Sequence, residues 1–184
     1  SDVCSSDLAA EDLAQEIGLD QPASADMLLE MYLRERLGVR VRYAPLGDVM
    51  RRYDPVAHEL WLNTAQPAAT RAFQMAFHVA VANLSDIVEA ELGEARFKSA
   101  EAVDVCRIGL GNYAAGALLT PYRRFAAAAR EQRHDVEQLA ATLGASLEQV
   151  CHRLSTLQRP GHRGVPFYFV RLDYAGNIKI GRAH

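Results

Sequence analysis

The sequence predicts an α+β fold that is predominantly helical, with a small antiparallel sheet, a helical pair and the first strand of a C-terminal domain. Apolar residues recur at helical spacing over two long segments, about 67–92 and 99–119. Segments with strand character stand at 39–43 and 58–63, and a third at 165–172 follows a Pro-Gly pair. With 184 residues and 49% hydrophobic content, the chain can bury one substantial core.

The first predicted elements are a helix and two strands. A helix over about 24–37 ends at Gly38, a residue that commonly follows the last helical turn. The segment 39–43 alternates apolar and polar residues, which is the period of a strand, and we expect it to pair antiparallel with 58–63. The segments between these strands are predicted as a short helical turn at 46–52 and a turn at 53–57.

Helices dominate the remainder of the chain. Pro67 suits the first turn of the first long helix, and Pro121 interrupts the second because proline cannot donate to the helical ladder. Ser146 with Gln149 three residues later has the form of a capping box. The helical segments expected after Pro121 are 125–132, 134–143 and 147–158.

Charge and composition limit the possible partners. A net charge of -3 gives no global case for binding nucleic acid. Residues 9–119 hold 16 acids and 10 bases, whereas 120–171 hold 8 arginines and 4 acids. The second half is therefore the more plausible anion-facing surface, with an ordinary solvated face as the alternative.

Cysteine usage and hydropathy predict a cytoplasmic protein with no membrane segment. The three cysteines have no CxxC spacing, so neither a zinc ribbon nor a disulfide framework is indicated. The longest apolar run, 108–122, is too short for a membrane span and is broken by glycines.

Both ends of the chain have the character of foreign sequence. Codons for residues 2–7 can be chosen whose reverse complement encodes the residues at 180–184, and the two strings resemble the two orientations of a sequencing-library adapter. We therefore expect 1–8 and 180–184 to be non-native scars, with the native gene continuing on both sides.

His78 lies in a helical stretch with the layout of a zinc-peptidase HExxH helix. In that motif two histidines one turn apart bind the metal, and the glutamate beside the first polarises the attacking water. Here Val79 stands at the glutamate position and Ala82 at the second histidine position. The motif is therefore degenerate and carries no catalytic residue.

In order along the chain, these features resemble a known family. The strands, the His78 helix and the run Asn112-Tyr-Ala-Ala-Gly-Ala-Leu-Leu-Thr-Pro121 are similar to the zincin-like ImmA/IrrE metallopeptidase-like domain. Residues 146–160, Gly164-Val-Pro-Phe167 and Asp173-Tyr-Ala-Gly-Asn177 resemble short-chain fatty acyl regulators of the RamB type. That resemblance implies an XRE-type DNA-binding helix-turn-helix before this domain and a sensory domain after it. We expect residues 9–160 to form the ImmA/IrrE-like domain and 161–179 to begin the sensory domain.

One departure from the peptidases removes the rest of the metal site. Peptidase members place a carboxylate ligand shortly before the Asn112 motif, but residues 107–111 contain no acid. Catalytic zinc needs three protein ligands and an open position, so His78 alone is only a vestigial candidate and no zinc is expected. His78 is then either a core histidine bonded to a backbone carbonyl or part of a ligand pocket. The stripe Phe73, Phe77, Val81 and Leu84 is expected to face the core.

Four arginines are the candidate effector-binding residues. Their planar guanidinium groups suit a phosphate, and an acyl-CoA carries several. The alternative is that they pair with acids of the C-terminal domain. The four are Arg153, Arg159, Arg163 and Arg171.

The helical pair within 134–158 has a helix-turn-helix pattern. Gln149, His152, Arg153 and Thr156 could face a DNA groove, but helix pairs are common, and we favour packing or subunit contact.

The sequence thus predicts a catalytically inactive regulatory domain of a bacterial transcription regulator. It would sense a short-chain acyl-CoA or related metabolite, act as a homodimer, and control DNA binding by an N-terminal helix-turn-helix. The first alternative is a zinc-dependent endopeptidase that cleaves a repressor. The second is a protein-binding module that uses the apolar face of 118–129.

Overall fold

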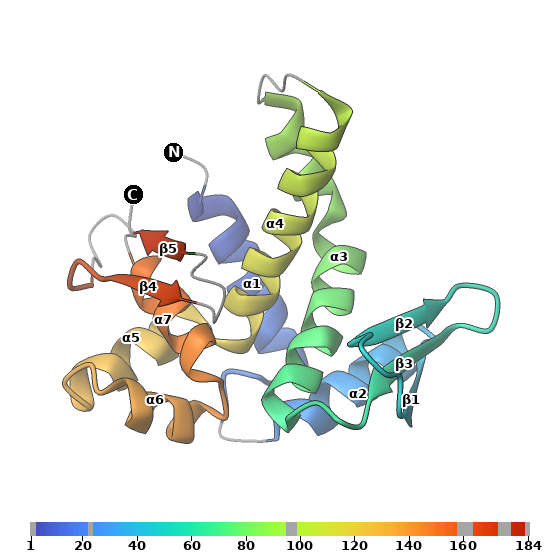
Figure 1. Ribbon diagram of the computed structural model, residues 1–184, viewed down its shortest axis with the longest axis horizontal. Coiled ribbons are helices and arrows are strands. Elements are labelled where there is room, and N and C mark those ends of the chain that lie inside the picture. The colour runs from blue at the N-terminus through green and yellow to red at the C-terminus, as the bar shows by residue number, and fades with distance from the viewer. Residues whose placement is uncertain (1–2, 22–23, 95–98, 158–163, 173–177, 183–184) are drawn as a thin grey trace. The chain divides into compact units, whose positions relative to one another are not determined.

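The computed structural model describes residues 3–21, 24–94, 99–157, 164–172 and 178–182. The chain divides into two compact units, 1–121 and 122–184, which we call the first and second units. The predicted fold class is confirmed, because the described residues form seven helices and a small three-stranded sheet (Figure 1). None of the described helices is long and apolar enough to cross a membrane.

The elements follow one another in a simple order. The helices are α1 (Val3–Ile17), α2 (Ala25–Arg36), α3 (Ala68–Glu94), α4 (Ala100–Leu119), α5 (Tyr122–Glu131), α6 (Val136–Leu143) and α7 (Leu147–Ser155). The strands are β1 (Arg40–Ala44), β2 (Arg51–Asp54), β3 (Glu59–Asn63), β4 (Tyr168–Leu172) and β5 (Ile178–Arg182).

The helices after α1 match their predicted segments to within three residues. The capping box at the start of α7 is present, with Ser146 and Gln149 each bonding the other's backbone N–H. We predicted no helix for α1, although Ala10, Leu13 and Ile17 recur at helical spacing and are buried.

The three-stranded sheet has the order β1-β3-β2 and corrects two predictions. β1 pairs with β3 in parallel, so the antiparallel pairing predicted for them was wrong. Antiparallel pairing instead joins β3 to β2, a strand that covers part of the predicted helical turn 46–52. Because β2 forms a hairpin with β3, only the opposite edge of β3 is left for β1.

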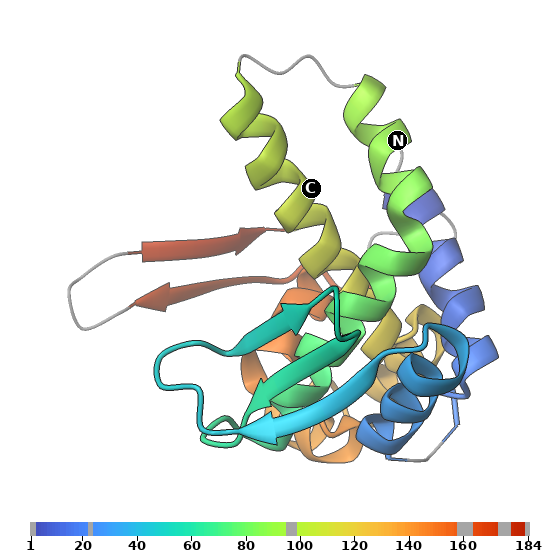
Figure 2. The same ribbon diagram turned by 90° about the vertical axis from the view of Figure 1, so that its right-hand side faces the viewer.

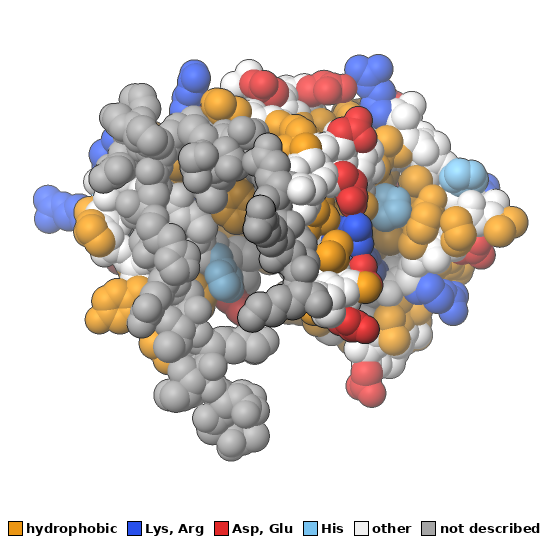
Figure 3. All heavy atoms as spheres, turned by 90° about the horizontal axis from the view of Figure 1, so that it is seen from above, with side chains coloured by type: hydrophobic (Ala, Val, Ile, Leu, Met, Phe, Trp, Pro, Cys, Tyr) orange, Lys and Arg blue, Asp and Glu red, His pale blue; other side chains and the backbone are white. Residues whose placement is uncertain are grey.

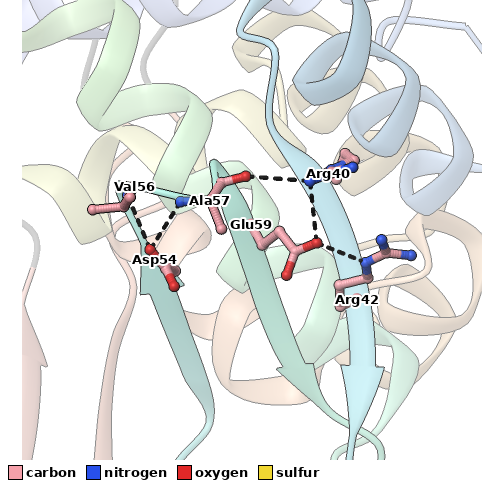
Figure 4. A network of polar contacts seen from close by, with 6 residues as sticks. All are labelled: Arg40, Arg42, Asp54, Val56, Ala57 and Glu59. Atoms are coloured by element: carbon pink, nitrogen blue, oxygen red, sulfur yellow. Dashed lines mark hydrogen bonds and ion pairs between the residues drawn. The ribbon is translucent and has the colours of Figure 1, made fainter.

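A short turn and an ion-pair network fix this arrangement (Figure 4). The Asp54 carboxylate accepts hydrogen bonds from the backbone N–H groups of Val56 and Ala57 at 2.9 and 3.0 Å. These bonds lower the pKa of Asp54 and close the β2–β3 turn. Glu59 on β3 bonds Arg42 on β1 at 3.1 Å, on the face of the sheet opposite Leu60.

The core of the first unit lies between its four helices and one face of the sheet. Leu60 and Leu62 point into this core and are fully buried. α3 and α4 lie side by side, and α2 and α3 cover the inner face of the sheet (Figure 2). On that face the Tyr43 hydroxyl donates to Glu30 of α2 at 2.9 Å, and Tyr53 contacts α3.

The second unit has its own core. Tyr122, Phe125, Leu139 and Leu154 of α5, α6 and α7 are almost fully buried together. The predicted strand 165–172 is present as β4 and pairs antiparallel with β5.

The first compact unit ends at Pro121. The domain boundary predicted near residue 160 stays a prediction. The predicted turn at 175–177 lies outside the described residues. Helix α1 begins at Val3 and β5 ends at Arg182, so regular structure includes parts of both predicted scars. Their foreign origin stays a prediction.

Asn63 is expected to be a major stabilising residue of the first unit. Its fully buried side chain donates to the carbonyls of Gly47 and Val49 at 2.8 and 2.9 Å and accepts from the Ala65 N–H at 3.0 Å. Asn63→Ala removes all three hydrogen bonds and should lower the free energy of unfolding by about 2–3 kcal/mol. Urea denaturation followed by Trp61 fluorescence measures the loss, with exposed Thr64→Ala as control. A loss below about 0.5 kcal/mol would contradict the role assigned to Asn63.

Candidate functional site

Helix α3 places the three positions of the degenerate motif in different environments. His78 is half-buried, Val79 is fully buried in the core, and Ala82 is exposed. The residue at the glutamate position of the motif therefore belongs to the core of the first unit.

His78 faces the sheet. Its ring lies against Tyr53 of β2, with centroids 4.4 Å apart and a tilt of 54°. Among the described residues it makes no hydrogen bond to a backbone carbonyl, contrary to one of our expectations. Burial and the nearby charge of Arg51 lower its pKa, so the imidazole is neutral at neutral pH. His78 is therefore a neutral imidazole at the junction of α3 and β2, with one nitrogen that can donate a hydrogen bond and one that can accept.

Arg51 is the charged residue of this junction, and the sequence analysis did not single it out. Its guanidinium carbon lies 3.9 Å from the centroid of the Phe77 ring, and its Nη1 donates to Gln74. Burial lowers the pKa of Arg51, although an arginine remains charged at neutral pH. Because β2 alternates, Arg51 and Tyr53 share its α3-facing side. The position of Arg51 beside α3 could be inferred only after β2 was known to be a strand.

Helix α4 closes the other side of Phe77. A Cβ atom added at Gly111 would lie 3.0 Å from the Phe77 ring, so any larger residue there would require the ring to shift. Arg107, one turn earlier, binds Glu89 and Asp104 at 2.7 Å each. We call Arg51, Tyr53, Phe77 and His78 the α3–β2 site.

The donor set does not fit a catalytic zinc ion. Three protein ligands are needed, and the α3–β2 site offers one histidine with a cationic guanidinium nearby. In the described part of the chain no three His, Cys, Asp or Glu side chains are grouped to hold a metal ion. The charge environment instead favours an anionic or oxygen-rich group.

The α3 stripe is only partly core. Phe73 and Phe77 pack against the core and Leu84 is buried, as expected, but Val81 is 45% exposed. The apolar face of 118–129 is buried, since Leu118 belongs to the first core and Phe125 to the second. This burial argues against its use as a protein-binding surface.

Of the four predicted effector arginines, the structure describes the side chain of Arg153. Arg153 is 4% exposed, and its guanidinium carbon lies 5.4 Å from the centroid of the Tyr122 ring. Arg159 and Arg163 lie outside the described residues, and Arg171 lies on β4 with its side chain not described. Their role in binding an effector stays a prediction.

The helical pair α6–α7 uses its supposed DNA-reading residues internally. Gln149 is part of the capping box, Arg153 is buried, and the Thr156 hydroxyl donates to the Arg153 carbonyl at 3.0 Å. His152 packs edge-on against Phe169 of β4 with centroids 4.6 Å apart. These contacts favour packing over base readout.

Charges on the face seen in Figure 3 are mixed. Acidic and basic side chains alternate with hydrophobic ones there, so the part of this face that is described shows no uniform field of one sign.

The single histidine on α3 and the Asn112 motif on α4 mark a metallopeptidase-like domain without a complete metal site. The chain belongs to the family described as IrrE N-terminal-like domain, whose sequence model matches residues 34–155. A second model, described as short-chain fatty acyl coenzyme A regulator, C-terminal, matches residues 156–182.

Several relatives are transcriptional regulators by name. The HTH-type transcriptional regulator RamB of Mycobacterium tuberculosis is 42% identical over 94% of this chain and 36% of its own length. The propionyl-CoA carboxylase regulator of Cereibacter sphaeroides is 56% identical over 65% of this chain and 26% of its own length. A solved Mycobacterium tuberculosis transcriptional regulator superposes with a TM-score of 0.91 at 42% identity, covering 97% of this chain and 55% of that one. The chain thus spans about a third of these curated relatives.

Proposed function

We propose that this chain is the catalytically inactive, effector-sensing part of a bacterial transcription regulator, and that its effector is a short-chain acyl-CoA or a related metabolite. The family membership and the names of the relatives support the regulatory role. A helix-turn-helix domain outside this chain would bind DNA, and two copies would pair to match a palindromic site.

One observation carries the proposal: the α3–β2 site has a fixed positive charge where a peptidase would hold zinc. Arg51 is half-buried, and burial together with the charge of Arg51 lowers the pKa of His78, so a second cation is disfavoured there. The guanidinium, the neutral imidazole and the Tyr53 phenol together offer donors to an oxygen-rich group, such as a phosphate or a thioester carbonyl. A charged donor in a partly dry site also gains strength from the low local dielectric.

Coupling to a distant DNA-binding domain needs a movable element, and β2 fits that requirement. It is an edge strand of only four residues, and both of its α3-facing side chains belong to the α3–β2 site. An effector that engages Arg51 and Tyr53 would hold β2 against α3, whereas the empty site would allow it to separate. Such a ligand shifts the balance between two arrangements by its differential affinity for them.

Replacing Arg51 should weaken effector binding without disturbing the sheet. Arg51→Met keeps the contact with Phe77 and removes the charge, and we expect the Kd of acetyl-CoA or propionyl-CoA to rise about tenfold or more, the loss of one charged hydrogen bond. Isothermal titration calorimetry measures the Kd of both ligands, and free coenzyme A is titrated for comparison. Arg52→Gln is the matched control, because Arg52 lies on the opposite, exposed side of β2.

Two results would contradict this proposal. An unchanged Kd for Arg51→Met would show that the α3–β2 site does not bind the effector. Arg159→Ala would then test the candidate effector arginines in the same assay. Stoichiometric zinc in the purified chain, measured by elemental analysis, would support the zinc endopeptidase instead.

A further inference from the structure

Three helices of the chain end in the same hydrogen-bonded turn. In this turn a residue with positive φ follows the helix, and the next N–H donates to the carbonyl five residues earlier. The bonds are Leu19 to Ala14 after α1, His134 to Ala129 after α5, and Ala145 to Ala140 after α6, at 2.8, 2.8 and 3.1 Å.

The residue at the positive-φ position differs at α5. Gly18 and Gly144 occupy it after α1 and α6, with φ of 88° and 62°. After α5 the position is held by Arg133 with φ of 52°, and His134 follows with φ of 62°. A side chain is strained in this conformation and glycine is not, so glycine would give the more stable turn.

Packing does not explain the arginine. Arg133 is exposed, and in the part of the chain that the structure describes neither it nor Arg130 is paired with a carboxylate. Strained residues are concentrated at functional sites, so the strain at Arg133 suggests that its side chain has a function.

Arg133 ends a basic face along α5. Residues 122–134 contain four arginines and one acid, Glu131. Arg123 and Arg130 are both exposed and seven residues apart, which places them on one side of the helix about 10 Å apart along its axis. Ala127, a small exposed residue, lies between them on the same side.

We propose that this basic face, formed by Arg123, Arg130 and Arg133, contacts the phosphate backbone of duplex DNA. Arginine suits phosphate because its planar donors match two oxygens at once. A small anionic metabolite is normally held in a concave site, whereas this face is the open side of a helix and fits an extended polymer. The contact would be independent of base sequence and would position the regulator on its site. It rests on the proposed function only in taking DNA as the polyanion.

The test uses the 184-residue chain and a fluorescent duplex of about 30 base pairs with arbitrary sequence, titrated between about 20 and 200 mM salt. Arg133→Gly and Arg130→Gln should each weaken binding about threefold to tenfold and reduce the slope of log affinity against log salt by about one unit. Arg133→Gly should at the same time raise the midpoint of thermal unfolding by about 2–4 °C, because it relieves the strain.

Two controls separate charge from structure. Arg133→Lys keeps the charge and should bind within about twofold of the parent chain. Arg34→Gln removes another exposed arginine, on α2 and outside the basic face, and should also leave binding unchanged.

Either of two outcomes would overturn the proposal: no measurable binding by the parent chain at the lowest salt, or unchanged binding by Arg133→Gly. Both are independent of acyl-CoA titration at Arg51, so failure of one proposal does not decide the other.

Discussion

Replacing Val79 with glutamate, which restores the second position of the HExxH motif, is expected to destabilise the first unit by about 3–5 kcal/mol. Val79 is fully buried in the core cluster of the first unit, where the one hydroxyl, that of Tyr32, already donates to Asn83 at 3.0 Å. The added carboxyl group would either be buried with its charge or bind a proton, and both cost free energy. No catalytic base would form.

Urea denaturation followed by Trp61 fluorescence measures this loss, because Trp61, the one tryptophan of the chain, lies in the first unit. Ala82→His, at the other degenerate position, is the matched control. Ala82 is exposed on the same helix, so its replacement should change the free energy of unfolding by less than about 0.5 kcal/mol. If Val79→Glu were as stable as Ala82→His, the glutamate would have reached solvent, and the inactive assignment of this helix would have to be revised.

Phe125→Ala should destabilise the second unit by about 3–5 kcal/mol. The Phe125 side chain is fully buried and packs in the cluster that contains Leu139 and Leu154. Removing the ring leaves a cavity, because the surrounding helices relax only partly; α6 and α7 are each held by a side-chain cap. A unit this small has few other core side chains to compensate.

Hydrogen exchange resolved by peptide should show the loss of protection in α5, α6 and α7. Trp61 fluorescence serves as the check that the first unit stays folded. Leu147→Ala removes a large side chain that is 52% exposed, and it should cost less than about 1 kcal/mol. Equal protection in the Phe125→Ala and Leu147→Ala variants would show that the second unit does not depend on this core.

Local signals explain which parts of the fold were predictable. The start of α7 follows from Ser146 and Gln149, whose side chains bond backbone groups only three residues away. Helix α1 has a different local signal, the helical spacing of Ala10, Leu13 and Ile17, which our prediction did not use. Strand β2 had no such signal, since Arg-Arg-Tyr-Asp is short and charged and becomes a strand only by pairing with β3.

The candidate site also has one part that the sequence predicted and one part that depends on tertiary contacts. The degenerate motif at His78 is a pattern within five residues, so the sequence predicted it. Arg51 comes to the site from another element and was missed, because its approach to Phe77 depends on the pairing of β2. Arg153 shows the converse case, since its charge suggested a surface contact and the fold buries it.

The sequence by itself determined the helices after α1, the loss of the metal ligands and the family resemblance. Each of these depends on residues close together in the chain or on their identity alone. Only the tertiary structure decided the parallel pairing of β1 with β3, the burial of Val79 and the meeting of Arg51 with His78. These depend on which distant segments come into contact, and burial and electrostatic environment are set by those contacts.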